Sequence, residues 1–341
     1  MSGMISIIIP CRNEEKYIAQ CLDSIIANGY PKDQLEILVV DGMSDDGTRA
    51  IIETYAMKYG YITMLDNEKK ITPSALNIGL RNAKGTTIMR MDVHAIYPEN
   101  YISGLLRWLA KTGADNVGGI SLICPAKHTL MAEAIAMGMS HWFGVGNSYF
   151  RIGTPEPRWV DTVPFGCYRR EVFEQIGMFD EELARNQDDE FNLRLINNGG
   201  RILLVPDIVL YYYARDSLQK LWRMYYQYGY FKPLVIRKIG GVLTIRQVVP
   251  AMFVLSMLIS GILAPWLPLA GEVLAAVVVP YAIVNLGCST VTALQRGAKY
   301  GFVLPIVFLV LHLGYGLGFL RGIVDFLVHN RTQPSNVTIS R

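Results

Sequence analysis

The sequence lacks paired cysteines and a marked excess of charge of one sign, and each absence excludes a class of possible functions. Its five cysteines are Cys11, Cys21, Cys124, Cys167 and Cys288. None belongs to a Cys-x-x-Cys pair, which argues against a zinc site or a redox pair, and an odd number without a framework fits a reducing compartment. The formal net charge of +3 over 341 residues is too small to indicate nucleic-acid binding.

Two further signals are missing. Residues 1–10 contain no basic region followed by an apolar core and a small-residue cleavage site, so we expect no secretory signal peptide. No Gly-x-Gly-x-x-Gly follows the first predicted strand, which disfavours a dinucleotide-binding fold of the usual kind. The soluble part of the protein is therefore expected to stay in the cytoplasm.

Charge is almost absent from residues 247–320, where only Glu272, Arg296 and Lys299 are charged. Long apolar stretches fill this region. They are Val248–Leu269, Val273–Leu294 and Phe302–Leu320. Each is about long enough to cross a hydrocarbon core of about 30 Å as a helix. Their succession favours a C-terminal α-helical transmembrane module of about three helices over buried soluble helices.

Basic residues flank these stretches and predict their orientation. They are Arg237, Lys238 and Arg246 before the first stretch, and Arg296 and Lys299 between the second and the third. The positive-inside rule then predicts an integral protein of the cytoplasmic (inner) membrane, with its first 246 residues in the cytoplasm. Complete crossing by all three stretches would put Arg321, Arg331 and Arg341 outside, against the rule. Either the third stretch is re-entrant, or residues 322–328 belong to another membrane segment.

The first half of the chain alternates apolar, strand-like runs with helix-like segments. The predicted strands are Ile5–Ile9, Leu35–Val40, Tyr61–Leu65 and Thr86–Met91, and the helices between them are Glu14–Ala27, Arg49–Lys58 and Pro73–Ala83, the last with Thr72 as a cap. Further on, we expect helices at His128–Phe143 and Gln187–Asn197 and two short strands at Ile202–Val205 and Val209–Tyr213. The alternation predicts an α/β domain with a mostly parallel sheet.

The predicted division of the chain has three parts. Residues 1–215 form the α/β domain, residues 216–246 an aromatic and basic helical linker, and residues 247–341 the membrane module with its tail. The aromatic residues of the linker are Trp222, Tyr225, Tyr226 and Tyr230. They fit a helix at the membrane interface, and core packing explains them equally well. His312 in the third apolar stretch is interpreted as a packed polar residue rather than a contact to a lipid head group.

Polar residues follow three of the predicted strands, at Pro10–Glu14, Asp41–Asp46 and Asp92–His94. In sheets of this kind, ligands bind outside the carboxyl ends of the strands. Asp92 and His94 are two residues apart, so their side chains point to the same side of an extended segment. Both could therefore face one ion or one phosphate group. The alternative is a strand end that carries a surface Asp and a surface His.

Asp188, Asp189 and Glu190 occupy the first turn of the helix predicted at residues 187–197. Acidic residues there favour the helix dipole, so a purely structural role is one interpretation. Successive helical residues lie about 100° apart, and the three carboxylates cannot all face one cleft. Asp188 shares its face with Asn192 and Leu195.

Taken together, these segments resemble the signatures of family 2 glycosyltransferases with the GT-A fold. The matching segments are residues 7–15 (IIIPCRNEE), 39–48 (VVDGMSDDGT), 90–94 (RMDVH), 159–166, 186–192 and 228–232. With membrane helices behind them, they are similar to the ExoA branch, which builds exopolysaccharide repeat units. The resemblance covers essentially the whole chain and implies a Rossmann-like GT-A domain.

The resemblance also implies roles for single residues. It implies nucleotide-sugar binding by Pro10, Asn13, Glu14, Asp41, Ser44, Asp46, Arg90 and Asp92. Asp41 is expected to contact the base. The Asp-x-Asp of the family binds ribose, pyrophosphate and a divalent cation, and it reads Asp92-x-His94 here. Asp92 and His94 are therefore the expected ligands of Mn²⁺ or Mg²⁺, of which Mn²⁺ tolerates nitrogen better.

The catalytic base of the family corresponds to Asp188, with Asp189 as the rival. The Glu that often precedes this base is Gln187 here. A cation neutralises the diphosphate leaving group, and a carboxylate takes the proton of the attacking hydroxyl. One base and no evident nucleophile predict single displacement with inversion. The expected reaction moves a sugar from a nucleotide sugar, by family habit a UDP-hexose, to a hydroxyl of a lipid-linked saccharide acceptor at the membrane.

Two other functions compete with this one. A processive polysaccharide synthase that also exports its product would need a channel, for which about three spans leave little material. The Gln-x-x-Arg-Trp motif of such enzymes is also absent, although residues 219–223 contain its ingredients in another order. The second alternative is a non-catalytic membrane scaffold that binds nucleotide sugars. The presence of Asp41, Asp92 and Asp188 together argues against it.

Overall fold

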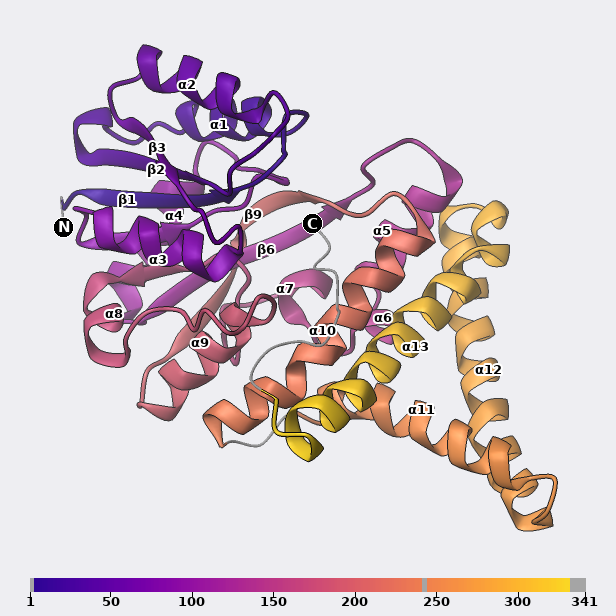
Figure 1. Ribbon diagram of the computed structural model, residues 1–341. Coiled ribbons are helices and arrows are strands. Elements are labelled where there is room, and N and C mark those ends of the chain that lie inside the picture. Colours follow the sequence, from indigo (N-terminus) through magenta and orange to yellow (C-terminus); the bar gives the residue numbers. More distant parts are fainter. Residues whose placement is uncertain (1–2, 241–243, 332–341) are drawn as a thin grey trace. The chain divides into compact units, whose positions relative to one another are not determined.

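The computed structural model describes residues 3–240 and 244–331. Its contacts divide the chain into two compact units, Met1–Leu122 with Gly153–Tyr212, and Ile123–Ile152 with Tyr213–Arg341 (Figure 1). We call them the sheet unit and the helical unit. Residues 123–152, which the sequence-based division assigns to the first domain, thus pack with the C-terminal helices. The tail of the predicted membrane module beyond Arg331 lies outside the described residues.

One mixed sheet of nine strands, within the described residues, forms the centre of the sheet unit. The strands are β1 (Ile5–Cys11), β2 (Leu35–Asp41), β3 (Ile62–Asp66), β4 (Thr87–Arg90), β5 (Ala95–Ile96), β6 (Asn116–Cys124), β7 (Arg158–Val160), β8 (Cys167–Arg169) and β9 (Ile202–Tyr213). Their order is β3-β2-β1-β4-β8-β6-β9-β5, and β7 pairs with β9. The first four strands are mutually parallel, as predicted, whereas β8 runs antiparallel to both β4 and β6.

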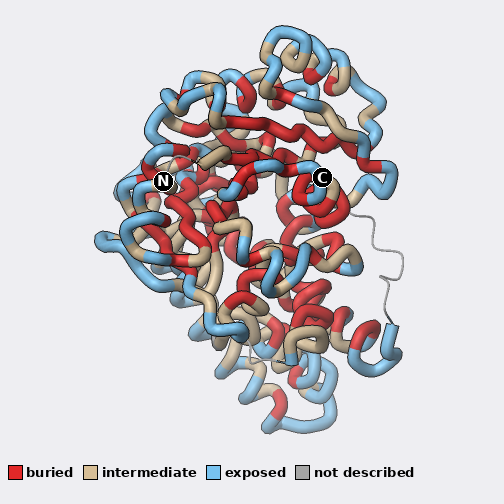
Figure 2. The backbone as a smooth tube through the Cα atoms, turned by 90° about the vertical axis from the view of Figure 1, so that its left-hand side faces the viewer, coloured by how far each residue is buried: buried red, intermediate tan, exposed pale blue. Residues whose placement is uncertain are grey.

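Helices cover both faces of the sheet. They are α1 (Ile18–Ile26), α2 (Thr48–Lys58), α3 (Thr72–Asn82), α4 (Tyr101–Thr112), α8 (Arg170–Ile176) and α9 (Gln187–Asn197). Side chains alternate along β1, so Ile7 and Ile9 join Leu22 of α1 in the main core. Ile8 points to the other face, where a Cβ on Gly79 of α3 would lie 2.4 Å from its side chain. Buried residues, red in Figure 2, therefore run along the strands.

The helical unit is built almost entirely from helices. They are α5 (Leu130–Met139), α6 (Trp142–Val145), α7 (Tyr149–Ile152), α10 (Leu218–Ile239), α11 (Ile245–Leu263), α12 (Pro268–Arg296) and α13 (Leu304–Gly322), which continues as a π-helical turn at Ile323–Val328. As predicted, three helical segments of the described residues are long and apolar enough to cross a membrane. They are Arg246–Leu263, Pro268–Arg296 and Ala298–Val328.

Three local predictions differ from the structure. The expected strands at 202–205 and 209–213 form one strand, β9. Its Pro206 lies between the residues paired with β7 and those paired with β5, where the missing N–H interrupts neither ladder. The helix expected at 128–143 is divided at Ser140 and His141, because the imidazole Nδ1 of His141 accepts the Phe143 N–H and starts α6 anew. Thr72 is the first residue of α3 and not its cap.

Gly119 in β6 generates a stability prediction. A methyl group on Gly119 would lie 2.3 Å from the carbonyl oxygen of Ile208, and backbone cannot move aside as a flexible side chain can. We expect Gly119→Ala to lower the free energy of unfolding by about 1–3 kcal/mol, measured by denaturant unfolding in detergent. Gly60 is the matched control, because a methyl group there would have nothing within 4 Å. Equal stability of the two Ala variants would contradict the close approach.

Candidate active site

The parallel half of the sheet places three polar segments at one edge. β1 lies between β2 and β4, with Cys11 opposite Asp41 and Ile8 opposite Arg90. The carboxyl ends of parallel strands meet at the same edge. The segments after residues 10, 40 and 91 therefore start side by side, as the sequence predicted.

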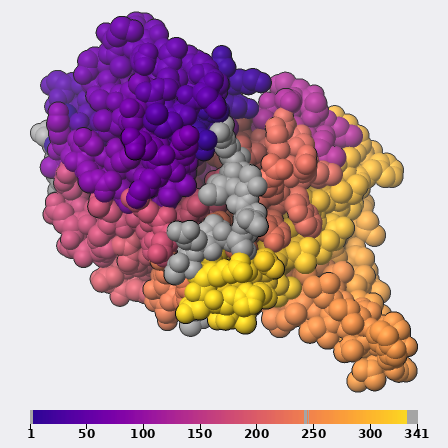
Figure 3. All heavy atoms as spheres, viewed as in Figure 1, coloured from indigo at the N-terminus to yellow at the C-terminus, as the bar shows by residue number. Residues whose placement is uncertain are grey.

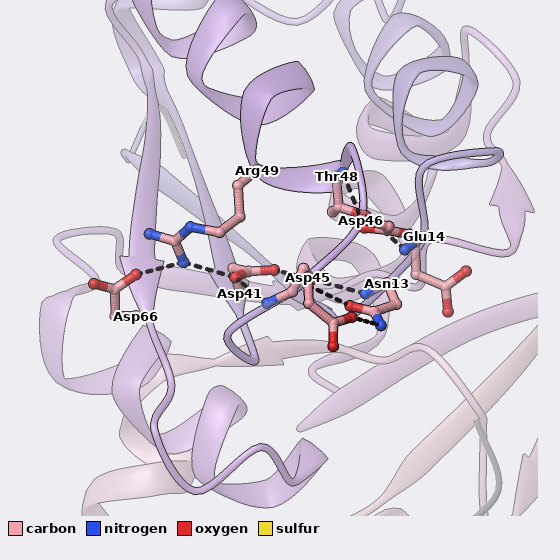
Figure 4. Close-up of polar contacts among 9 residues, drawn as sticks. Asn13, Glu14, Asp41, Asp45, Asp46, Thr48, Arg49 and Asp66 are labelled. Atoms are coloured by element: carbon pink, nitrogen blue, oxygen red, sulfur yellow. Dashed lines mark hydrogen bonds and ion pairs between the residues drawn. The ribbon is translucent and has the colours of Figure 1, made fainter.

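The loops after β1 and β2 are joined by a network of hydrogen bonds (Figure 4). The Asn13 N–H donates to Ser44 Oγ at 2.7 Å, and the Glu14 N–H donates to Thr48 Oγ1 at 2.7 Å. The Asn13 side chain exchanges hydrogen bonds with Asp45, and its own backbone is left-handed, with φ at 52°. Pro10 remains within β1, opposite Val40. The hydroxyl groups of Ser44 and Thr48, which follow β2, thus hold the backbone of the loop after β1.

Asp41 is fully buried, and its own protein occupies both carboxylate oxygens. Oδ2 accepts the Ser44 N–H at 2.9 Å and pairs with Arg49 Nη1 at 2.7 Å, while Oδ1 accepts the Ser44 hydroxyl. Arg49 also pairs with Asp66 at the end of β3, at 2.9 Å. Arg49 therefore connects the ends of β2 and β3 (Figure 4), a role that the sequence analysis missed.

Asp46 lies just before helix α2 and holds the loop from the other side. Its Oδ1 accepts the Thr48 N–H at 3.0 Å and the Thr48 hydroxyl, and its Oδ2 accepts the Glu15 N–H at 3.4 Å. Slight burial opposes ionisation, but the hydrogen bonds from Thr48 and Glu15 lower the pKa of Asp46 below its ordinary value. Asp46 is therefore ionised at neutral pH, at the positive end of α2.

Asp92 and His94 form a tight turn after β4. Asp92 Oδ1 accepts the His94 N–H at 2.9 Å. Tyr97 holds the same turn from behind, since its hydroxyl accepts the Asp92 N–H at 2.6 Å and donates to the Asp92 carbonyl oxygen at 3.1 Å. The buried hydroxyl of Tyr97 was also missed from the sequence.

The imidazole of His94 lies against the loop that follows β1. Its Nε2 is 3.0 Å from Glu14 Oε1, and its ring centroid is 4.7 Å from that of Tyr17. Two residues predicted separately, Glu14 as a nucleotide contact and His94 as a metal ligand, are thus direct partners. Glu14 therefore fixes the direction of the imidazole, as carboxylates do for ligand histidines.

Arg90 connects this turn to helix α9. Its guanidinium is buried and lies 3.3 Å from Asp188 Oδ2. Burial opposes the charge, but the carboxylates of Asp188 and Asp92 raise the pKa of Arg90 above its ordinary value. The guanidinium therefore stays charged, and its contact with Asp188 places that carboxylate beside the end of β4.

The three acidic residues at the start of α9 have different partners. Asp188 pairs with Arg90. Glu190 is buried and forms a two-fold contact with Arg194, at 2.7 and 2.9 Å, and Arg194 in turn donates to the carbonyl oxygens of Ile176 and Met178. Glu190 therefore has a structural role. On the face of Asp188, Asn192 is buried and hydrogen-bonded to Asn116.

The side chains at Asp92 fit a cation that takes some of its ligands from the protein and the others from a bound substrate. No group of three or more His, Cys, Asp or Glu side chains able to hold a metal ion exists in the part of the chain that the structure describes. Asp92 Oδ2, however, has no hydrogen-bond partner among the described residues. Mg²⁺ is commonly held by one or two carboxylates plus phosphate and water oxygens, and Asp92 with His94 suits such a site.

Further polar atoms near the strand ends are buried without a hydrogen-bond partner among the described residues. They are Arg12 Nε after β1, Asn67 Oδ1 after β3, Arg90 Nε at the end of β4 and Gln187 Oε1 at the start of α9. Buried polar groups are usually paired, and each exception calls for an explanation. A polar ligand at this edge of the sheet would supply the missing partners.

Comparisons with known proteins agree with this geometry. Residues 6–177 match the sequence profile described as "Glycosyl transferase family 2". A protein of Methanococcus voltae, "Dolichyl N-acetyl-alpha-D-glucosaminyl phosphate 3-beta-D-2,3-diacetamido-2,3-dideoxy-beta-D-glucuronosyltransferase", is 30% identical over 94% of this chain and 98% of its own length.

The chain belongs to glycosyltransferase family 2. The predicted resemblance to the ExoA branch is confirmed, because the succinoglycan biosynthesis protein ExoA of Rhizobium meliloti is 28% identical over 94% of this chain and 95% of its own length.

A solved structure shares the fold of this glycosyltransferase. The mannosyltransferase PcManGT of Pyrobaculum calidifontis, determined with GDP-Man and Mn²⁺, has a TM-score of 0.59 at 21% identity and covers 92% of this chain and 87% of its own. The predicted GT-A fold is thereby confirmed, with a sheet that is parallel in its first half and mixed beyond it.

Arg49 generates a prediction about the loop architecture. Arg49→Leu leaves the buried Asp41 carboxylate without its cation, so we expect the free energy of unfolding to fall by about 1–3 kcal/mol. The measurement is denaturant unfolding of the purified glycosyltransferase. Asp66→Asn is the control, because this partner of Arg49 is exposed and its loss should change stability by about 0.5 kcal/mol or less. Equal losses in both variants would mean that Asp41 does not depend on Arg49.

Proposed function

We propose that this glycosyltransferase moves a sugar, with inversion, from a nucleotide sugar to a hydroxyl of a lipid-linked saccharide in glycan or exopolysaccharide synthesis. The observation that carries the proposal is the ion pair between the buried guanidinium of Arg90, at the end of β4, and Asp188 of α9, 3.3 Å apart. It connects the sheet edge, where a carboxylate is suited to a cation and a diphosphate, to a second carboxylate suited to act as a base.

The nucleotide sugar would bind across the ends of β1, β2 and β4. Asn13, Ser44 and Asp46 give the loops their shape, and the buried unpaired atoms of Arg12 and Asn67 supply donor and acceptor positions. Both oxygens of Asp41 are held by Ser44 and Arg49. Asp41 would therefore contribute to recognition of the nucleotide base indirectly, by fixing the shape of the loop. For Asp41 to contact the base directly, Ser44 or Arg49 would first have to release one of the Asp41 carboxylate oxygens. The nucleotide is proposed to be UDP from the habit of the family.

A divalent cation would be held by Asp92, with His94 as a second ligand or as a support. When bound, such a cation acts as a Lewis acid on the diphosphate and offsets the charge that develops as the sugar departs. Neighbouring residues of the chain already hold both candidate ligands in position. Tyr97 fixes the backbone of Asp92, and Glu14 orients the imidazole of His94. The Mn²⁺ with which PcManGT was determined supports a cation in this fold.

Asp188 would take the proton of the acceptor hydroxyl at a carboxylate oxygen. It stands at the start of α9 and contacts Arg90, and a positioned carboxylate of this kind can act as a general base. Burial, followed by the charges of Glu14 and Asp41, raises the pKa of Cys11 well above its ordinary value. This nearby thiol is therefore protonated and a poor nucleophile, which supports direct displacement by the acceptor.

The acceptor is proposed to be lipid-linked because the enzyme has three apolar helices and because the name of its Methanococcus voltae relative contains a dolichyl phosphate sugar. The positive-inside rule then assigns the sheet unit to the cytoplasmic side of the inner membrane. A lipid-linked saccharide presented at that surface would gain the large entropic advantage of a held reactant.

Metal dependence is the first test of the proposal. We expect turnover of UDP-sugar to be lost in excess chelator and restored by Mn²⁺. His94→Ala should weaken Mn²⁺ binding about 10–100-fold, the range seen when a supporting group is removed, as followed by the electron paramagnetic resonance of Mn²⁺ in the presence of UDP. Full activity in chelator contradicts the cation, and unchanged Mn²⁺ binding by His94→Ala contradicts only the role of His94.

The second test concerns the base. Asp188→Asn should still bind UDP-sugar but lose about 10²–10⁴-fold in turnover, the usual share of general-base catalysis. Donor binding is measured by calorimetry and turnover by release of UDP with a purified lipid-linked acceptor. Asp189→Asn, one residue further along α9, is the matched control and should keep its activity. The assignment is wrong by one residue if the control loses turnover and Asp188→Asn does not.

A further inference from the structure

We propose that the membrane is entered by the α11–α12 hairpin alone and that α13, although long and apolar enough to cross, stays with both ends on the side of the sheet unit. The inference rests on the membrane association put forward above and concerns only the packing inside the helical unit. The partner of the exposed surface of the hairpin is then the interior of a lipid bilayer.

The backbones of helices α13 and α10 are in close contact at glycine residues. A Cβ on Gly318 would lie 2.0 Å from the carbonyl oxygen of Tyr226, and one on Gly322 would lie 2.2 Å from that of Tyr230. From the α10 side, a Cβ on Gly229 would lie 2.0 Å from the carbonyl oxygen of Tyr315. Small residues spaced by four allow such close approach of two helices. The two helices therefore form one rigid pair, which we call the glycine-packed pair.

The glycine-packed pair is parallel. Gly314, Gly318 and Gly322 face Trp222, Tyr226 and Tyr230 in turn, so the residue numbers rise together along both helices. The far end is fastened as well, because the Tyr230 hydroxyl donates to Asp325 Oδ2 at 2.8 Å and Arg237 Nη1 donates to the Phe326 carbonyl oxygen at 2.6 Å. The position of α13 relative to the membrane is therefore set by that of α10.

Helix α10 is unsuited to the bilayer core. Its charged residues are Lys220, Arg223, Lys232, Arg237 and Lys238. Of these, Lys220 and Arg223 are exposed. A Lys or Arg at the centre of a membrane helix costs about 2.5–3.5 kcal/mol on insertion scales. Among the described helices, α10 is accordingly not one of the candidates for crossing. It follows β9 directly, so it starts on the side of the sheet unit.

The start of α13 is also fastened to that side. Residues 123–152 are joined to the sheet unit at both of their ends, and α5 at 10 residues is too short to cross. Tyr300, just before α13, donates its hydroxyl to Glu133 of α5 at 2.7 Å. A Cβ on Gly138 would lie 2.6 Å from Val307, and His312 Nε2 donates to the Phe143 carbonyl oxygen at 2.8 Å. Both nitrogens of His312 are engaged, the other with Tyr281, in keeping with its interpretation as a packed residue.

The α11–α12 hairpin is more exposed than α13, although α11 also contacts α13, where a Cβ on Gly316 would lie 2.4 Å from the carbonyl oxygen of Pro250. In the most apolar 18-residue stretch of each segment, only 22% of α11 and 11% of α12 is buried. The corresponding share for the segment that contains α13 is 44%. The two helices hold each other at Phe253 and Tyr281, whose rings stack with centroids 4.4 Å apart. The apex carries Trp266 at 74% exposure and projects away from α13 (Figure 3). Exposed apolar helices with a Trp at the turn fit a lipid environment.

The distribution of charge agrees with this topology. Between Arg246 and Arg296 the only charged residue is Glu272, near the apex. The cations at the base of the hairpin and around the glycine-packed pair are Arg237, Lys238, Arg246, Arg296, Lys299, Arg321 and Arg331. With α13 uncrossed, all of them lie on one side and satisfy the positive-inside rule. Three crossings would place Arg321 and Arg331 opposite Lys299 and violate it.

The test is the sidedness of single cysteines in the full-length protein. Cys124 and Cys288 are first replaced by alanine, since Cys11, Cys21 and Cys167 are buried. The probe is a membrane-impermeant maleimide, applied to right-side-out and to inverted vesicles. His329→Cys reports the end of α13, Lys299→Cys its start, and Met57→Cys, at an exposed position of α2, reports the sheet unit.

We expect the cysteines at positions 329, 299 and 57 to react in the same vesicles and to be protected in the others. Reaction of position 329 only in the opposite vesicles overturns the inference and leaves the proposed function intact. A protein that alkaline carbonate washes from the membrane overturns the inference and the membrane insertion on which it rests, and it leaves sugar transfer itself to be judged by the turnover assay. As a second measurement, alkaline phosphatase fused to the C-terminus should be inactive and a fluorescent protein there should be bright. The reverse result counts against the inference.

Discussion

The parallel pairing of β1 with β2 and β4 is the constraint on which the arrangement of the active site depends. Because these strands are neighbours and run in the same direction, the segments that follow them begin at one edge. Two of the resulting loops hold each other by backbone hydrogen bonds to Ser44 and Thr48. The chemistry of the site therefore follows from the sheet, and its side chains need only short loops to reach their places.

A second constraint is electrostatic. The buried guanidinium of Arg90 requires a negative partner, since a buried unpaired charge is costly, and it finds one in Asp188. This contact joins β4 to α9 across about a hundred residues of sequence, so the proposed cation-binding turn and the proposed base hold a fixed relation. A bound diphosphate would enter an arrangement in which the opposing charges are already in position, as favours electrostatic catalysis.

Much of this was predictable because the signals are local. The apolar β-branched run of β1, the polar residues that follow it and the bounds of α9 at Gln187–Asn197 depend on neighbouring residues. The contacts of Arg49 with Asp66 and of Tyr97 with Asp92 depend on how loops fold back, for which an Arg or a Tyr carries no distinctive pattern. The antiparallel β8 and the uninterrupted β9 were missed for a similar reason. Partners far along the chain decided them, and Pro206 lies between the residues of β9 that pair with β7 and those that pair with β5.

The glycine row of α13 also has a consequence for synthesis in the cell. Helix α10 leaves the ribosome well before α13, which is among the last described elements of the chain. Until α13 arrives, the face of α10 that receives it, with Tyr230 and Phe231, has no cover. Domains fold in the order in which they emerge, and exposed apolar surface invites misassembly. The proposed insertion of the α11–α12 hairpin, which lies between α10 and α13 in the sequence, would keep the unfinished chain at the membrane during this interval, so that α13 would close the unit there.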